Sequence, residues 1–226
     1  MRSPIGTRWI LTLVLGFLSS SAALAATTHA DAAKEVTAAG KTLDDFVADP
    51  DMNWFREHAK EAKGLMICSK VVKAGFVFGG SGGRCVLVVK GEKGWHGPAF
   101  YATGTASAGF QAGVQESEIV GLLMTQKVID ALMSSEFKLS GNASVAAGPV
   151  GAGAAATPSA DIIYYSRSKG LYGGVDISGA VVKPSEDYNT AYYGKAVSPI
   201  DIIVKGAAHT KESSPLIARV TKLYGK

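Results

Sequence analysis

The sequence predicts an α+β protein dominated by antiparallel strands, folded as a barrel-like or strongly curved sheet with N-terminal helices and a C-terminal helix. Apolar residues recur at helical spacing near the beginning and the end of the chain that follows residue 25. Between these ends, short apolar runs are bounded by glycine clusters, as is typical of strands and turns. Most of the 27 glycines of the chain lie in this region, where they permit turns, bulges and close approach of strands. Many short strands of this kind favour a curved or closed sheet.

Residues 1–25 have the features of an export signal. Two arginines give a positive start, residues 9–18 form an apolar run, and Ala23-Leu24-Ala25 resembles a signal-peptidase site. The run is shorter than the roughly 20 apolar residues that a membrane span requires. We expect cleavage after Ala25 and a periplasmic or secreted protein, without a transmembrane helix. A lipid anchor would need a cysteine at the cleavage site, and the first cysteine is Cys68.

The rest of the chain is expected to form one globular unit, with a helical segment at 26–61 and a strand-rich domain at 62–226. Asp49-Pro50-Asp51 separates two helices, because a residue before proline avoids the helical region, and Asp51 is expected to cap the second. A closing helix is expected after Pro215. The apolar faces of the N-terminal helices fit packing on the core or insertion into a membrane interface.

The strand-rich region contains ten expected strands. Glycine and polar residues set their limits. Strands are expected at residues 65–72, 75–79, 84–89, 99–103, 106–114, 119–124, 138–145, 161–166, 173–180 and 200–204, with a hairpin turn at 90–94 and a helix at 126–134. Residues 141–157 are almost all small, so they either pack against large side chains or form a flexible loop.

The charge of the chain is too small to favour nucleic acid as a partner. The formal charge is +4, and removal of the two arginines before residue 25 leaves 4 − 2 = +2. From Lys60 to Lys93, however, seven basic residues face only two acidic ones. This local excess fits a solvated strand surface or a patch for an anionic surface.

Cys68 and Cys85 are the two cysteines of the chain. An even number in an oxidising compartment favours a disulfide between them, and two buried free thiols are the alternative.

Residues that could support catalysis are sparse. The four histidines lack metal-ligand spacing, and the chain has no G-x-S-x-G nucleophile motif. We therefore expect no enzymatic activity, no metal and no cofactor.

Several ordered segments resemble one known family. The most specific is YSRSKGLYGGVDISG at residues 165–179. It is preceded by AKGLMI at 62–67, VVKAGFVFGGSGG at 71–83, Trp95 with PAF at 98–100, SAGFQAG at 107–113 and AAGPVG at 146–151. Together these segments resemble the SYLF domain family, whose eukaryotic members include Ysc84-like actin-binding proteins. The chain departs from the family pattern at Cys68-Ser69, Cys85, Tyr172 and Gly173, and the cysteines fit a disulfide peculiar to exported members.

The resemblance implies a protein that binds phospholipid without catalysing a reaction. We carry over anionic phospholipid or a membrane surface as the partner, and we do not carry over actin binding. Lys70, Lys73, Arg84, Arg167 and Lys169 are the candidate lipid-binding residues. The alternative for Arg167 is a structural role, and the segment 79–84 fits either a phosphate-binding loop or a tight turn.

A second hypothesis is a structural or protein-interaction module of the bacterial cell envelope, with incidental lipid affinity. Its protein partner is unknown from the sequence. Salt dependence separates the two hypotheses, because a contact between charges weakens as salt rises.

Overall fold

The computed structural model describes residues 26–75, 78–108, 113–151, 159–168, 171–172, 177–208 and 210–225. The expected export signal therefore lies outside the described residues. None of the described helices is long and apolar enough to cross a membrane.

The chain enters the fold through a long helix, α1 (His29–Ala48). Thr28 and Asp31 form a capping box at its start, in which each side chain accepts a hydrogen bond from the other residue's amide. One face of α1, including Val36, Leu43 and Phe46, is buried. The apolar face therefore packs on the core, which is the first of the two alternatives for this segment.

The second helical segment is shorter than expected. It consists of a 3-10 turn at Pro50–Met52, the helix α2 (Asn53–His58) and a further 3-10 turn at Ala59–Glu61. The cap is Asp49 and not Asp51, because the Asp49 carboxylate accepts the Asp51 amide at 2.9 Å. The proline restricts its predecessor to an extended conformation, which suits a capping residue.

Nine strands form one sheet in the described parts of the chain. They are β1 (Gly64–Gly75), β2 (Phe78–Gly91), β3 (Gly94–Ala108), β4 (Gly113–Leu123), β5 (Phe137–Lys138), β6 (Val145–Ala147), β7 (Ile162–Ser168), β8 (Leu171–Tyr172) and β9 (Val181–Pro184). Their order is β5-β9-β3-β2-β1-β4-β7-β6, with β8 paired to β7. All pairs are antiparallel except β6 with β7. The α+β fold with a curved antiparallel sheet is thus confirmed.

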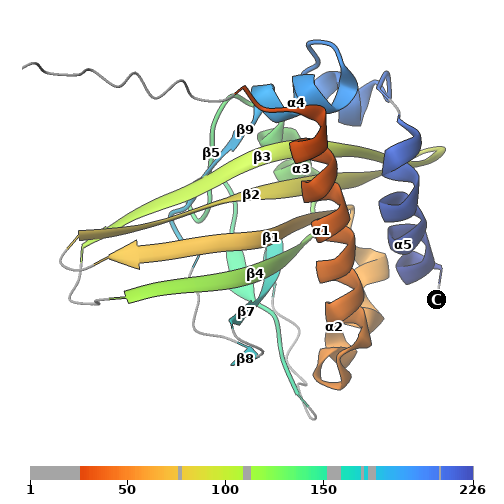
Figure 1. Cartoon of the computed structure of the whole chain (residues 1–226). Coiled ribbons are helices and arrows are strands. Elements are labelled where there is room, and N and C mark those ends of the chain that lie inside the picture. Colours follow the sequence, from red (N-terminus) through yellow and green to blue (C-terminus); the bar gives the residue numbers. More distant parts are fainter. Residues whose placement is uncertain are drawn as a thin grey trace, which may run out of the picture.

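The central strands are longer than the sequence indicated. Residues 79–84, expected as a turn or loop, lie within β2 and pair with both β1 and β3. A Cβ at Gly83 would lie 2.5 Å from the carbonyl oxygen of Lys70, so glycine here permits a close approach of strands rather than a turn. The far halves of β1–β4 form an arm that extends away from the helices (Figure 1). We define the arm as residues 70–75, 78–84, 103–108 and 113–117.

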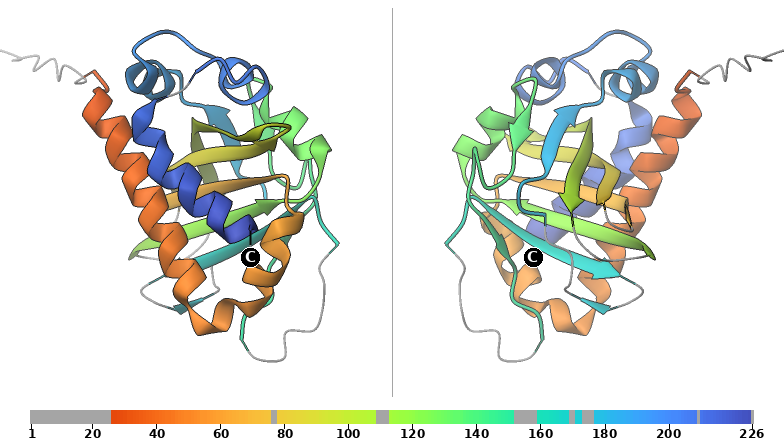
Figure 2. Two further views of the ribbon diagram at one scale, coloured as in Figure 1. Left: turned by 90° about the vertical axis from the view of Figure 1, so that its right-hand side faces the viewer. Right: turned by 90° about the vertical axis from the view of Figure 1, so that its left-hand side faces the viewer.

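Both faces of the central strands are buried near the body of the protein. On the helix face, Leu65, Val86 and Val120 pack with apolar residues of α1 and α2. On the opposite face, which we call the cavity face, Leu87 and Ile119 belong to a second buried cluster. Figure 2 shows α1 and α5 (Ser214–Tyr224) crossing the first face, and α3 (Gln126–Leu132) with β9 on the second.

Several segments after residue 124 differ from expectation. The helix expected at 126–134 and the closing helix after Pro215 are present as α3 and α5. The expected strand 138–145 is interrupted by a turn at 141–142, with β6 beginning only at Val145. Residues 200–204 form a turn of π-helix instead of a strand. Ile202 and Ile203 are buried, whereas Ile200 and Val204 are exposed, and a short, mostly apolar run is compatible with either structure.

The segment before the π-helical turn contains a strand and a helix that the sequence pattern did not predict. Of the expected strand 173–180, residues 173–176 lie outside the described residues, and 177–180 form a turn. The strand follows as β9, and a helix, α4 (Glu186–Tyr193), comes next.

A disulfide joins Cys68 of β1 to Cys85 of β2, with the Cα atoms 4.0 Å apart. The pairing that the sequence favoured is therefore present in the structure. The two strands are already neighbours, and β1 has a bulge between Ile67 and Lys70. In the chain-entropy model, closing a loop of this size contributes about 3 kcal/mol to the stability of the fold.

The AAGPVG segment packs against the tyrosine that opens the signature at 165. Gly148 lies against the buried ring of Tyr165, so close that a Cβ at this position would overlap the ring at 2.1 Å. Two backbone hydrogen bonds hold the segment, from the Gly148 amide to the Tyr164 carbonyl and from the Gly151 amide to the Asp51 carbonyl. Of the two alternatives for residues 141–157, packing against a large side chain is therefore the correct one for the AAGPVG segment.

We predict that Gly148→Ala destabilises the fold by several kcal/mol, because either the ring of Tyr165 or the backbone must move. The free energy of unfolding in urea measures the effect. Gly82→Ala is the matched control, since its Cβ would meet its nearest neighbour at 3.7 Å. Equal stability of the two variants would contradict the packing role of Gly148.

Candidate functional site

Arg167 joins two strands to the first helix. Its guanidinium donates to Glu118 of β4 at 2.5 and 3.0 Å and to Asp45 of α1 at 3.4 Å. The other Glu118 oxygen accepts the Thr42 hydroxyl of α1 at 2.8 Å. Only 16% of the Arg167 side chain is exposed. These contacts favour the structural alternative for Arg167.

Lys70 and Arg84 also lie on the helix face and have partners there. They are cross-strand neighbours on β1 and β2. Lys70 forms an ion pair with Glu116 at 2.7 Å, and the Arg84 guanidinium lies 4.1 Å from the centre of the Tyr188 ring. Lys73 lies on the opposite face of the sheet, the cavity face. Lys169 is outside the described residues.

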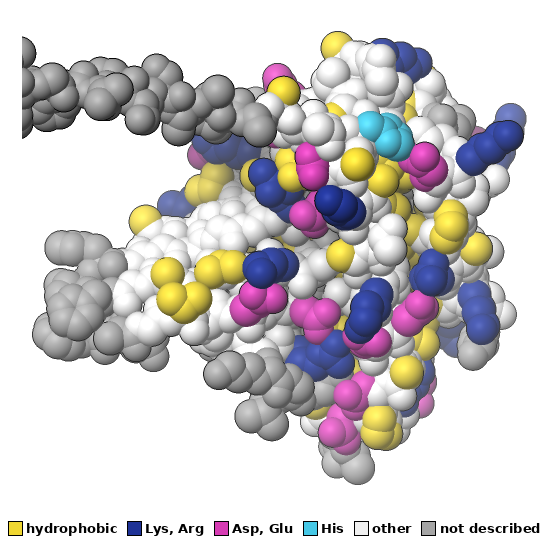
Figure 3. All heavy atoms as spheres, in the orientation of Figure 1, with side chains coloured by type: hydrophobic (Ala, Val, Ile, Leu, Met, Phe, Trp, Pro, Cys, Tyr) yellow, Lys and Arg dark blue, Asp and Glu magenta, His cyan; other side chains and the backbone are white. Residues whose placement is uncertain are grey.

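The candidate basic residues therefore do not form one continuous patch. Figure 3 shows Lys and Arg side chains alternating with Asp and Glu side chains along α1. Hydrogen bonding by Lys41, followed by its charge and that of Arg167, lowers the pKa of the Asp45 carboxyl despite the opposing effect of burial. A surface of interspersed charges attracts an anionic membrane less than an all-basic one.

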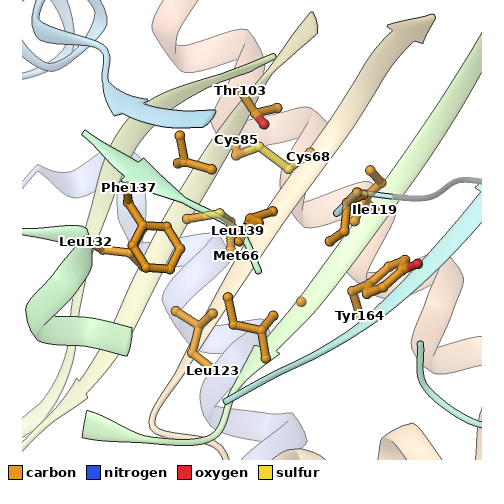
Figure 4. A pocket seen from close by; sticks show the side chains of 14 residues that line it. Met66, Cys68, Cys85, Thr103, Ile119, Leu123, Leu132, Phe137, Leu139 and Tyr164 are labelled. Atoms are coloured by element: carbon orange, nitrogen blue, oxygen red, sulfur yellow. A yellow bond between two sulfur atoms is a disulfide. The ribbon is translucent and has the colours of Figure 1, made fainter. Parts of the chain in front are cut away.

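The cavity face holds a narrow apolar hollow. The empty space here is about 500 Å³ when the adjoining open solvent is included, and about 40 Å³ of it admits the centre of a water molecule. The Cys68–Cys85 disulfide and Thr103 lie at one end and Leu123 at the other, while Leu132 and Phe137 face Tyr164 across it (Figure 4). Its lining is almost entirely apolar, so it suits a hydrocarbon group.

A row of polar side chains follows the hollow on the same face of the arm. Thr103 lines the hollow, and Thr105 lies two residues further along β3, on the same face. Thr105 is opposite Ser81, with their hydroxyls 2.8 Å apart, and Ser81 is opposite Lys73. Lys73 is in turn opposite Gln115. We call Thr105, Ser81, Lys73 and Gln115 the polar row.

A thin layer of chain covers the hollow. We define the cover as residues 126–139, which comprise α3 and β5 and contribute Leu132, Phe137 and Leu139 to the lining. β5 pairs with β9 over two residues, and β9 with β3 over four. Further bonds fix the cover. The buried Tyr101 hydroxyl donates to the Leu132 carbonyl at 2.9 Å, and an ion pair joins Glu136 to Lys183 at 2.8 Å. The Leu139 amide donates to the Ala180 carbonyl at 2.9 Å, and the Gly179 amide donates to the Leu139 carbonyl at 3.1 Å. The backbone of the cover is thus attached to the sheet mainly at and beside β5, and segments held by few backbone bonds open locally.

Asp161 anchors the beginning of the cover. Its carboxylate accepts the Ser144 amide and hydroxyl, both at 2.9 Å, and the Thr125 hydroxyl at 2.8 Å. Lys127 of α3 lies 3.3 Å away. The backbone hydrogen bond from Ser144, then the hydroxyl of Thr125, hold the pKa of Asp161 far below its usual value.

The described residues contain no cluster of three or more His, Cys, Asp or Glu side chains that could hold a metal ion. The described histidines have structural contacts. His96 Nδ1 lies 2.6 Å from the Ile203 carbonyl, and His58 stacks on Trp54. His209 is outside the described residues.

Comparison with known proteins identifies the family of this chain. A family model described as Ysc84, Las17-binding protein actin regulator, matches residues 104–223, which is more than half of the chain. The chain belongs to this family. It is the SYLF family that the sequence motifs resemble. The matched range includes β4, β7, the cover and α5.

Relatives in fungi and mammals extend the match. LAS seventeen-binding protein 3 and Protein YSC84, both of Saccharomyces cerevisiae, are 38% identical over 145 residues, or 60% of this chain. Human SH3 domain-containing YSC84-like protein 1 is 31% identical over 149 residues, or 63% of this chain. The matches cover 31%, 30% and 43% of these relatives, so the chain spans less than half their length. One of these relatives is named as a binding protein, and none of the three carries the name of an enzyme.

The sequence did not indicate the residues that line the hollow and form the polar row, apart from Lys73 and the two cysteines. Sequence patterns indicated only some of these positions. Alternation along β3 places Thr103 and Thr105 on one face, and Gly121 interrupts an apolar strand. Without the register between strands, these positions could not be assigned to one surface.

We predict that Arg167→Met lowers the stability of the protein by about 2 kcal/mol, because Glu118 is left partly buried without its cation. Urea unfolding of this variant, of Glu118→Gln and of the double variant measures the coupling. Unchanged stability, together with weaker binding to anionic vesicles, would instead show that Arg167 contacts a head group.

A second prediction concerns Asp161 in acid. Because its pKa is lowered on folding from 3.8, its contribution to stability is present above that value and is lost as the pH falls towards the folded pKa. Asp161→Asn should be less stable by about 1–2 kcal/mol at neutral pH, and the difference should shrink below pH ~4. Unfolding free energies between neutral pH and pH ~2 measure this, and a constant difference would contradict it.

Proposed function

We propose that this protein is a non-enzymatic phospholipid-binding protein that uses the cavity face of its sheet. The observation that carries the proposal is the arrangement of that face, where an apolar hollow leads directly to the polar row. A phospholipid has the same two parts, a hydrocarbon region and a charged head group. The lipid affinity implied by the family resemblance also supports the proposal.

The charge of the polar row favours an anionic head group. Lys73 brings a positive charge, while Ser81, Thr105 and Gln115 bring neutral hydroxyl and amide donors. The acidic residues Glu116 and Glu118 project from the other face, where Lys70 and Arg167 bind them. Lys73 is therefore the candidate basic residue that best fits a head group beside the hollow.

We also propose that the protein acts in the cell envelope after export. Two features support this location. The first 25 residues have the pattern of a signal peptide, and the Cys68–Cys85 disulfide suits an oxidising compartment.

A flotation assay with vesicles tests the lipid function. We expect binding to phosphatidylglycerol vesicles that weakens as salt rises, and little binding to phosphatidylcholine vesicles. Lys73→Glu should weaken binding by about tenfold or more, since each charge near an anionic surface contributes about 1 kcal/mol. Lys195→Glu is the control, as Lys195 is exposed on a different part of the chain. Equal flotation of both variants and the unaltered protein would exclude this role of Lys73.

A protein-interaction module is the second candidate, favoured by the name of one relative, LAS seventeen-binding protein 3, and by the family description, Las17-binding protein actin regulator. In that case the polar row would contact a protein. The same vesicle assay separates the two functions, because a protein-interaction module predicts no salt-sensitive preference for phosphatidylglycerol over phosphatidylcholine.

A further inference from the structure

At the floor of the hollow, one position in the middle of a buried strand carries no side chain. Gly121 lies in β4 between Ile119 and Leu123, and all three line the hollow. A glycine within a strand weakens it and often marks a position where another group approaches closely. The space above Gly121 admits a Cβ without overlap. A Cβ there would have its nearest neighbours at 3.6 Å, on Ile162, and 3.8 Å, on Met66.

The hollow has the length and width of one hydrocarbon chain. From Ile119 to Leu123 the strand advances 123 − 119 = 4 residues, or about 13 Å. A lipid chain in one leaflet spans about 15 Å, half of the hydrocarbon core of a bilayer. The space is too narrow for two chains side by side, since only about 40 Å³ admits the centre of a water molecule.

The cover must move away from the sheet for a hydrocarbon chain to enter the hollow. It is held over the hollow at its start by Asp161 and at the end of α3 by the Tyr101 hydroxyl. Beyond α3, it is held by the two paired residues of β5 and by the backbone bonds of Leu139 to Gly179 and Ala180. Loss of the bond from Tyr101 to Leu132 would release the inner wall at Leu132 without removing any apolar surface.

We propose that the hollow binds a single alkyl chain of a fatty acid or lysophospholipid, which lies over Gly121 beneath the cover. The anionic group of this ligand lies at the polar row, beside Lys73. This inference rests on the proposed lipid function and adds the ligand class, the position of the chain and the segment that moves. Thr103 and the disulfide lie at the end of the hollow from which β3 continues to Thr105 of the polar row.

Two variants test the position of the chain. Gly121→Val places a branched side chain in the hollow and suits a strand, so palmitate should bind at least tenfold more weakly, as measured by native mass spectrometry and calorimetry. Gly121→Ala should have a smaller effect of the same sign. Gly82→Val is the matched control, because Gly82 is exposed on the arm, outside the hollow, and its Cβ would meet only the Thr103 carbonyl oxygen, at 3.7 Å. Urea unfolding establishes that each variant is folded.

A third variant tests the cover. Tyr101→Phe removes the bond to the Leu132 carbonyl and keeps the ring, so palmitate should enter and leave several-fold faster, as measured by stopped-flow fluorescence. Unchanged rates would overturn the role of the cover.

The outcomes separate this inference from the proposed function. If Gly121→Val binds palmitate as the unaltered protein does, the chain does not lie over Gly121 and the inference is wrong. If the unaltered protein binds phosphatidylglycerol vesicles but neither palmitate nor lysophosphatidylglycerol, the lipid function stands and the single-chain site is wrong. If it binds no lipid of any kind, both are wrong.

Discussion

The structure depends on one constraint, which is that the central strands are apolar on both faces near the body of the protein. Leu65 and Val86 point to one side of the sheet, and Leu87 and Ile119 to the other. Each face must be covered, because exposed apolar surface of this extent costs free energy in water. The helices α1, α2 and α5 cover one face. On the other face, the short elements around α3, β5 and β9 form a thinner layer, and the apolar hollow lies beneath it.

The two faces differ in their electrostatics. On the helix face, charges are arranged in opposed pairs that fix α1 to the sheet, with Arg167 between Glu118 and Asp45 as the most buried example. Partial burial strengthens such a network and makes the loss of one member costly. On the cavity face, Lys73 stands in a row of neutral polar side chains next to apolar surface. The first arrangement stabilises the fold, whereas the second leaves an amphiphilic surface that matches the two parts of a lipid.

Sequence patterns predicted the elements with strong local signals. Helical spacing identified α1, α3 and α5. The two glycines within residues 90–94 identified the β2–β3 turn, and the cysteine count favoured the disulfide. The long strands were divided incorrectly, because glycine is a turn residue in most contexts and here permits close packing at Gly83 and Gly148. Residues 200–204 were assigned to a strand because a short apolar run has no distinguishing period. The same ambiguity concealed β9 and α4.

The sequence by itself determined the family and the fold class, since these follow from ordered motifs and local periodicity, and it favoured a disulfide that the structure then showed. Only the tertiary structure decided which basic residues share a surface. Lys70 and Lys73 are three positions apart, so alternation places them on opposite faces, and the bulge between Ile67 and Lys70 together with the pairing to β2 and β4 sets which face each one takes. A register is set by contacts between strands distant in the chain, and a shift of one residue exchanges the faces. The hollow over Gly121 is decided in the same way, because its walls come from β1, β4 and β7 and from a cover that no local pattern places there.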